Sequence, residues 1–180
     1  GKKKIAVFDS SMSGSTDMLL SNSINDLVYR AMESGDSIEM HYQPITRLDS
    51  GKVDYYEALV RIRNGDQLIM PSTIFPLIEG RRLEAEFDSI ILGSIAKDLA
   101  LGKIPAGTGI SFNVSGLGVI DPAVLEKIHA LAAYLPQYKL IIEVTETALI
   151  TQLQTASSIL NKLRQSGFLI ALDDFGSGYS

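Results

Sequence analysis

Cysteine, long apolar runs and an excess of positive charge are missing from this sequence, and each absence excludes a class of protein. Without cysteine there are no disulfides and no thiolate metal sites, which is typical of a reducing compartment. No apolar run reaches the roughly 18 residues of a membrane span, and the first lysines do not lead into the apolar core of a signal peptide. The net charge of −5 argues against a protein that wraps duplex nucleic acid, because neutralising phosphates takes a basic face. We expect a cytoplasmic location, for the chain itself or as the cytoplasmic part of a membrane-anchored protein.

The 180 residues, 46% of them hydrophobic, are enough for one globular domain and a piece of another. Residues 1–17 contain a short apolar strand and a linker rich in serine and glycine, which indicates the end of an upstream domain. Residues 18–35 have helical periodicity and are predicted to form a connecting helix. We expect the main domain to occupy residues 36–180.

The main domain begins with two strands and continues as alternating strands and helices. Ile38–Gln43 predicts a strand that stops at Pro44, and Val53–Ile62 predicts its antiparallel partner. Short apolar strands then alternate with amphipathic helices, a rhythm that predicts βα units and a parallel sheet. The predicted helices are one that begins at Pro71, then Leu83–Leu101, Pro122–Tyr134 and Thr151–Gln165, and the predicted strands are Gly109–Phe112, Leu140–Val144 and Phe168–Leu172. The fold class is therefore α/β.

Four oxygen-bearing side chains lie in or at the end of the predicted strands: Glu57, Asn113, Glu143 and Asp173. In parallel α/β sheets and barrels the carboxyl ends of the strands meet at one edge, where active sites gather. Oxygen ligands suit a hard cation such as magnesium, manganese or calcium. Each residue alone is better explained as a hydrogen-bonded strand end, but together they favour a metal site. The acids alone also leave open a metal-dependent barrel enzyme of the enolase kind.

Five short motifs, named below in chain order, together resemble an EAL domain, the bacterial phosphodiesterase domain that hydrolyses cyclic di-GMP. The resemblance covers the chain from about Asp36 to the last residue, and the Glu-Ala-Leu-Val-Arg run argues against the enolase alternative. The motifs are Tyr42-Gln43-Pro44-Ile45, Glu57-Ala58-Leu59-Val60-Arg61, Phe112-Asn113-Val114-Ser115, Glu143-Val144-Thr145-Glu146 and Asp173-Asp174-Phe175-Gly176-Ser177-Gly178-Tyr179-Ser180. The first residues, Ile5-Ala6-Val7-Phe8-Asp9, resemble the end of a GGDEF domain, a domain that commonly precedes EAL domains.

The resemblance implies a fold, an activity and a role for particular residues. The fold is a TIM-type (β/α) barrel, here incomplete, with an antiparallel first strand. The activity is metal-dependent hydrolysis of cyclic di-GMP to linear pGpG by a homodimer that uses magnesium or manganese, with two ions in a complete site. The implied metal ligands are Glu57, Asn113, Glu143, Asp173 and, for the second ion, Asp174.

Two further groups of residues receive a role from the resemblance. Gln43, Leu59 and Arg61 would contact the ligand, and the forked guanidinium of Arg61 suits a phosphate. Glu146 would anchor the loop that contains Asp174, near the dimer interface. The implied catalytic residues are Glu57, Asp173, Asp174 and Glu146.

The 145 residues from Asp36 onward are fewer than the roughly 200 or more that a barrel of this type needs. Three explanations are open: a piece of a longer chain, which we favour, a shortened gene product, or two copies that complete each other's barrel. The family's later lysine and glutamate motifs are not in this sequence, so we expect the 180-residue polypeptide alone to hydrolyse little or no cyclic di-GMP. The alternative function is a non-catalytic cyclic di-GMP receptor or interaction module.

Overall fold

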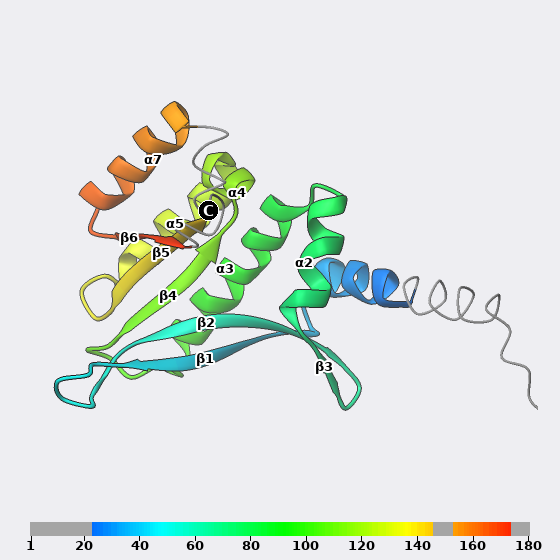
Figure 1. The fold of residues 1–180 in the computed structure, drawn as a ribbon, viewed down its shortest axis with the longest axis horizontal. Helices are drawn as coiled ribbons and strands as arrows, with labels where there is room; N and C mark the ends of the chain where they lie inside the picture. Colours follow the sequence, from blue (N-terminus) through cyan, green and yellow to red (C-terminus); the bar gives the residue numbers. More distant parts are fainter. Residues whose placement is uncertain (1–22, 146–152, 174–180) are drawn as a thin grey trace, which may run out of the picture.

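The computed structural model describes residues 23–145 and 153–173, and these form one sheet with helices packed on it (Figure 1). Neighbouring strands follow the order β1-β2-β4-β5-β6, with β3 paired to β2. The strands are β1 (Ile38–Thr46), β2 (Val53–Asn64), β3 (Gln67–Ile69), β4 (Gly109–Val114), β5 (Lys139–Thr145) and β6 (Leu169–Asp173). The helices are α2 (Pro71–Gly80), α3 (Glu84–Ala100), α4 (Gly116–Ile120), α5 (Pro122–Leu131), the 3₁₀ turn η1 (Ala132–Tyr134) and α7 (Leu153–Gln165).

The topology confirms the predicted α/β class with an antiparallel first strand. β1 pairs antiparallel with β2, while β2, β4, β5 and β6 run parallel. Helices make the crossovers between the parallel strands, as parallel pairing requires. Within the described residues the sheet is open, with β1 and β6 at its two edges.

The two faces of the sheet differ in character because side chains alternate along each strand. One face packs against the helices, which gather on one side of the sheet in Figure 1. Its side chains in the three central strands are apolar and buried: Ala58, Val60, Ile62, Ile110, Phe112, Val114, Leu140, Ile142 and Val144. The core therefore lies between the sheet and the helices, and side chains on the other face of the sheet are not part of it.

The prediction that the first strand stops at Pro44 is wrong, because β1 continues to Thr46 and Pro44 pairs in register with Tyr56. Proline lacks an N–H to donate, but β1 is an edge strand, where some N–H positions face away from the sheet. The sequence analysis also missed β3, which forms a hairpin with β2 through the two-residue turn Gly65-Asp66. Gly65 has φ +59°, as such turns require.

The helix boundaries follow capping chemistry that the sequence already contains. α3 differs from its predicted range by one residue at each end. Asp121 caps α5 as predicted, since its carboxylate accepts from the N–H of Ala123 at 2.9 Å and of Val124 at 3.1 Å. The predicted range to Tyr134 is confirmed as α5 continued by η1. The sequence analysis missed the short α4, which Ser115 caps.

Residues 23–34 are helical, consistent with part of the predicted connecting helix, and they pack onto the same core. Leu27, Val28 and Ala31 are buried there, and the guanidinium of Arg81, the residue after α2, lies over the ring of Tyr29. Residues 1–22, including the predicted strand and linker, lie outside the described residues. None of the helices in residues 23–145 and 153–173 has the length and apolarity that crossing a membrane takes.

Two buried acids on α3 connect the helix layer to the sheet. Asp98 accepts a hydrogen bond of 2.9 Å from the hydroxyl of Tyr42 in β1 and forms an ion pair of 2.6 Å with Lys103. Asp88 accepts from both the backbone N–H and the hydroxyl of Ser115, the residue after β4. Burial raises the pKa of Asp88 to about 7, because the hydrogen bonds from Ser115 only partly compensate for desolvation.

Replacing Tyr42 with phenylalanine removes one hydrogen bond between β1 and α3. We expect Tyr42→Phe to lower the free energy of unfolding by about 1–2 kcal/mol, because the buried Asp98 carboxylate loses one of its donors. Tyr56→Phe is the matched control, since the structure gives the hydroxyl of that half-buried tyrosine no hydrogen bond in the described part of the chain. Urea denaturation of both variants tests this, and equal losses would contradict the role of the bond.

Asp88 predicts a pH dependence of stability with a definite sign. Between about pH 4, the pKa of an unfolded aspartate, and about pH 7, the folded protein retains a proton that the unfolded chain releases. Stability at this group is therefore present below about pH 4 and falls as pH rises through the window. We therefore expect the free energy of unfolding of Asp88→Asn, minus that of the parent protein, to rise as the pH increases from 4.5 to 7.5. Urea denaturation at a series of pH values measures this difference. Parallel curves for the two proteins would refute this assignment, since all other groups cancel in the difference.

Candidate functional site

The three predicted metal ligands whose side chains are described lie on the face of the sheet turned away from the helices. Glu57 pairs in register with Ser111, and Asn113 lies two residues further along β4 on the same face. Asn113 in turn pairs with Glu143 across β4 and β5, where neighbouring strands are about 5 Å apart. Asn113 is exposed, and Glu57 and Glu143 are half-buried. The structure therefore brings these residues to one face from three neighbouring strands.

The backbone register also explains why the predicted ligands are not at equal positions along their strands. Glu57 occupies one row of the sheet, Asn113 and Glu143 the next row, and Asp173, which pairs with Thr145, the row after that. Strands in a barrel tilt relative to its axis, so residues at one height climb the register from strand to strand. The stagger from β2 to β6 is thus the pattern that residues level with one another in a barrel have.

Tyr55 shows that two of the carboxylates lie close enough to act on the same group. Partial burial is the main cause that raises the pKa of the Tyr55 hydroxyl, and the charge of Glu143 and then of Glu57 raises it further. Tyr55 lies on the same face as Glu57, two residues before it in β2. The negative potential of both glutamates therefore overlaps on this face, which favours a cation there.

Ser111 lies in the same row as Glu57, and its hydroxyl is buried. The side chain is fully shielded from solvent, and its Oγ has no hydrogen-bond partner within the described residues. A buried hydroxyl without a partner costs about 1–3 kcal/mol, which a polar group bound at this row would offset. Together with an all-oxygen donor set, this makes the face compatible with a hydrated divalent cation.

The described residues do not contain a complete metal site. In residues 23–145 and 153–173, no three His, Asp or Glu side chains gather closely enough to hold an ion. Two of the predicted residues, Glu146 and Asp174, lie outside the described residues, and Asp173 is placed by its backbone alone. The predicted binding of metal by these residues stays a prediction.

The three predicted ligand contacts also lie on this face. Gln43 pairs in register with Glu57, and Leu59 and Arg61 follow Glu57 at two-residue intervals. Gln43 is exposed, while Leu59 and Arg61 are half-buried. An amide, an apolar surface and a guanidinium therefore stand beside the carboxylates on β1 and β2.

The guanidinium of Arg61 is held near the backbone and not by a carboxylate. Its Nη1 donates to the carbonyl of Val60 at 2.7 Å, and it forms no ion pair within the part of the chain that the structure describes. The nearby Glu39 is bound instead by Arg63, whose Nε and Nη2 both donate to its carboxylate, Nη2 at 3.0 Å. Arg63 thereby holds the pKa of Glu39 down to about 2. The charge of Arg61 is therefore left for an anion from outside.

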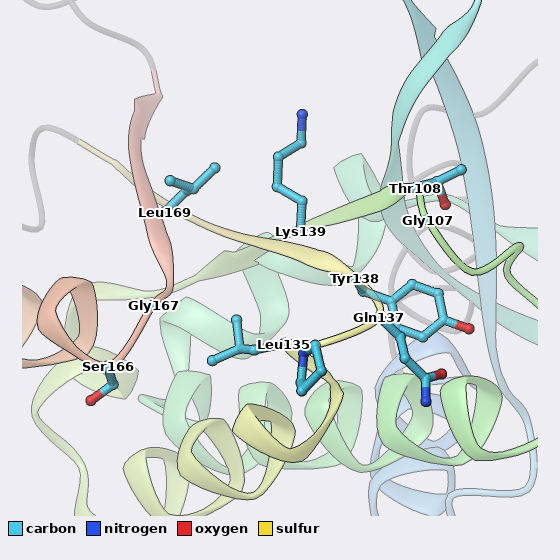
Figure 2. A pocket seen from close by; sticks show the side chains of 10 residues that line it. Gly107, Thr108, Leu135, Gln137, Tyr138, Lys139, Ser166, Gly167 and Leu169 are labelled. Carbon is cyan, nitrogen blue, oxygen red and sulfur yellow. The ribbon is translucent and has the colours of Figure 1, made fainter.

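A surface hollow lies at the other end of the parallel strands from the predicted ligands (Figure 2). Its lining comes from the residues just before or at the start of β4, β5 and β6, and Lys139 and Leu169 point from the strands to the same side in Figure 2. Lys139 is its one ionisable residue with a charge at neutral pH, and it pairs with Asp54 at 2.9 Å. The hollow therefore lies at the amino ends of the parallel strands and lacks the acids of the predicted site.

Sequence reasoning missed the residues that hold the site from behind. Asp88 contacts Ser115, the last residue of the Asn113 motif, and Asp98 contacts Tyr42 next to Gln43. Both acids interrupt the apolar stripe of α3, and an acid at a position predicted to be buried is the signal that identifies such a contact.

Known proteins with similar sequences match most of this chain. The profile of the EAL domain matches residues 26–180. The cyclic di-GMP phosphodiesterase NbdA of Pseudomonas aeruginosa is 36% identical over 151 residues, which cover 81% of this chain and 19% of the relative. The probable cyclic di-GMP phosphodiesterase PdeG of Escherichia coli is 28% identical over 160 residues, which cover 86% of this chain and 31% of the relative. The chain thus spans less than a third of the length of these curated relatives.

Solved structures share the fold. The Xanthomonas citri FimX EAL domain in complex with c-diGMP has a TM-score of 0.74 at 20% identity, covering 91% of this chain and 65% of that chain. The PaMucR phosphodiesterase in its c-di-GMP complex has a TM-score of 0.70 at 27% identity, covering 84% and 64%. This likeness confirms the predicted fold of a (β/α) barrel of the EAL type, which is open in the described residues. From the matched residues and the shared fold, the chain belongs to the EAL domain family.

Proposed function

We propose that this chain contributes the metal and phosphate contacts for the hydrolysis of cyclic di-GMP to linear pGpG. The observation that supports this most directly is the single sheet face on which Glu57, Asn113 and Glu143 stand beside Gln43 and Arg61. The relatives named as cyclic di-GMP phosphodiesterases have the same substrate in their names. The non-catalytic receptor remains an outcome of the tests below.

Magnesium or manganese is the cofactor that these oxygen donors suit. We propose that Glu57, Asn113, Glu143 and Asp173 hold one ion, that Asp174 helps to hold a second, and that Glu146 anchors the loop containing Asp174. When bound, a pair of such ions makes water nucleophilic near neutral pH and stabilises negative charge on a phosphoryl group. The carboxylates of Glu57 and Glu143 would hold the ions at the face where Ser111 offers a further buried oxygen.

The chain's own residues would bind and orient the substrate. Arg61 would place its donors on a phosphate oxygen, with Gln43 and Leu59 contacting the remainder of the nucleotide. Water attacks the phosphorus in line, one P–O bond of the ring breaks, and the released ribose oxygen takes up a proton, so the ring opens to a linear dinucleotide. We further propose that the protein works as a homodimer in the cytoplasm.

A titration with and without metal tests this function. We expect cyclic di-GMP to bind in the presence of Mn²⁺ or Mg²⁺ and to bind more weakly after chelation, because the carboxylates of this face repel phosphate unless a cation is bound. Calorimetry measures binding, and chromatography detects pGpG. In the 180-residue polypeptide alone we expect little turnover, since the family's later lysine and glutamate motifs are not in this sequence. Binding that is indifferent to metal would refute the metal-dependent enzyme and favour a receptor.

Two neighbouring arginines on the same face separate a phosphate contact from general charge. Arg61→Ala should weaken cyclic di-GMP binding by about 10- to 100-fold, the effect of losing a charge-assisted hydrogen bond worth roughly 1.5–3 kcal/mol. Arg63→Ala is the matched control. Because Arg63 is already bound to Glu39, its replacement should change cyclic di-GMP binding little. Binding isotherms at fixed ionic strength compare the two. Equal losses in both variants would indicate a nonspecific electrostatic effect and count against Arg61.

A further inference from the structure

The end of β4 is held from the helix side by a chain of hydrogen bonds. The Oδ2 atom of Asp88 accepts from the Ser115 backbone N–H at 2.9 Å and from the Ser115 hydroxyl at 2.6 Å. The same hydroxyl oxygen accepts from the N–H of Gly118 at 2.9 Å. Asp88 is 7% exposed, so these contacts are shielded from water and fix one geometry.

The fit of Gly118 against Asp88 is a second, independent sign of this fixed geometry. A Cβ atom added to Gly118 would lie 2.0 Å from the Oδ2 of Asp88 and 3.1 Å from the Oγ of Ser115. Any residue other than glycine would therefore displace the carboxylate. The backbone of Gly118 does not have a positive φ, so the requirement for glycine at this position is one of space.

Asn113 depends on this support because it lies beyond the last residue of β4 that pairs with β2. The register of β2 and β4 ends with Ala58 opposite Phe112, whereas that of β4 and β5 continues to Val114. Asn113 therefore has a paired strand on one side only. Its backbone leads within two residues to Ser115, where Asp88 holds the chain.

We propose that Asp88 is a positioning residue that, through Ser115, fixes the strand end on which Asn113 is presented to the metal. This inference rests on the proposed function, in which Asn113 is a ligand. Asp88 itself lies on α3, on the helix side of the sheet, and within the described residues its hydrogen bonds go to Ser115 and not to the open face. A small shift of β4 would matter because a slip of one residue turns Asn113 toward the helices.

Manganese binding separates this role from simple stabilisation. The Mn²⁺ dissociation constant is measured by electron paramagnetic resonance of the free ion, and the thermal midpoint of each variant is recorded beside it. Loss of a residue that orients a metal ligand typically weakens metal binding by about 10- to 100-fold. We expect that weakening in Asp88→Ala and in Gly118→Ala, which leaves every polar group in place and acts by displacing the carboxylate. Asp88→Asn keeps an acceptor oxygen and should restore most of the affinity.

Asp121→Ala is the matched control, because it likewise removes a carboxylate that accepts two hydrogen bonds, here as the cap of α5, and should lower the thermal midpoint with the Mn²⁺ affinity unchanged. Asn113→Ala tests the proposed function in the same assay. If Asn113→Ala binds Mn²⁺ like the parent protein, the proposed function fails and this inference with it. If Asn113→Ala loses affinity while Asp88→Ala and Gly118→Ala keep it, the proposed function stands and the positioning role of Asp88 is wrong.

Discussion

The alternation of side chains across a sheet that is covered on one face is the constraint on which the whole structure depends. Because helices cover one face, every second residue of β4, of β5 and of the Ala58–Ile62 part of β2 is apolar and buried. The residues between them are free of that demand, and there the chain has Glu57, Asn113 and Glu143. The alternation that gives the domain its core therefore also places the predicted oxygen ligands on the same face of the sheet.

This origin explains how much of the site could be predicted and where prediction stopped. The βα rhythm and the two hairpin strands were readable because buried strands are short and apolar, and the site face followed from the polar residue within each. Pro44 misled because proline ends an interior strand but is tolerated at an edge, and the edge position of β1 is a tertiary fact. The hairpin of β2 and β3 was missed although Gly65-Asp66 is a pair of residues typical of a two-residue turn.

The contacts that hold the site from the helix side could not have been derived in the same way. Asp88 and Ser115 are 27 residues apart, and the bond between Tyr42 and Asp98 spans 56 residues. Periodicity assigns each acid to the buried side of α3 but does not identify its partner, since that depends on how the helix packs on the sheet. What the sequence does supply is the anomaly, a carboxylate where an apolar residue is expected.

A buried carboxylate on an apolar helix face needs a physical reason, because a well-packed apolar residue of similar volume is often as stable or more so. Apolar packing holds two surfaces together but tolerates small sliding, whereas two donors converging on one oxygen fix direction and distance. At Asp88 the bonds reach the end of β4, beyond its pairing with β2, where a shift of the backbone would move Asn113. Gly118 allows this contact by the absence of a side chain. The acid is best explained by the accuracy it gives to one strand end, and not by the stability it adds to the fold.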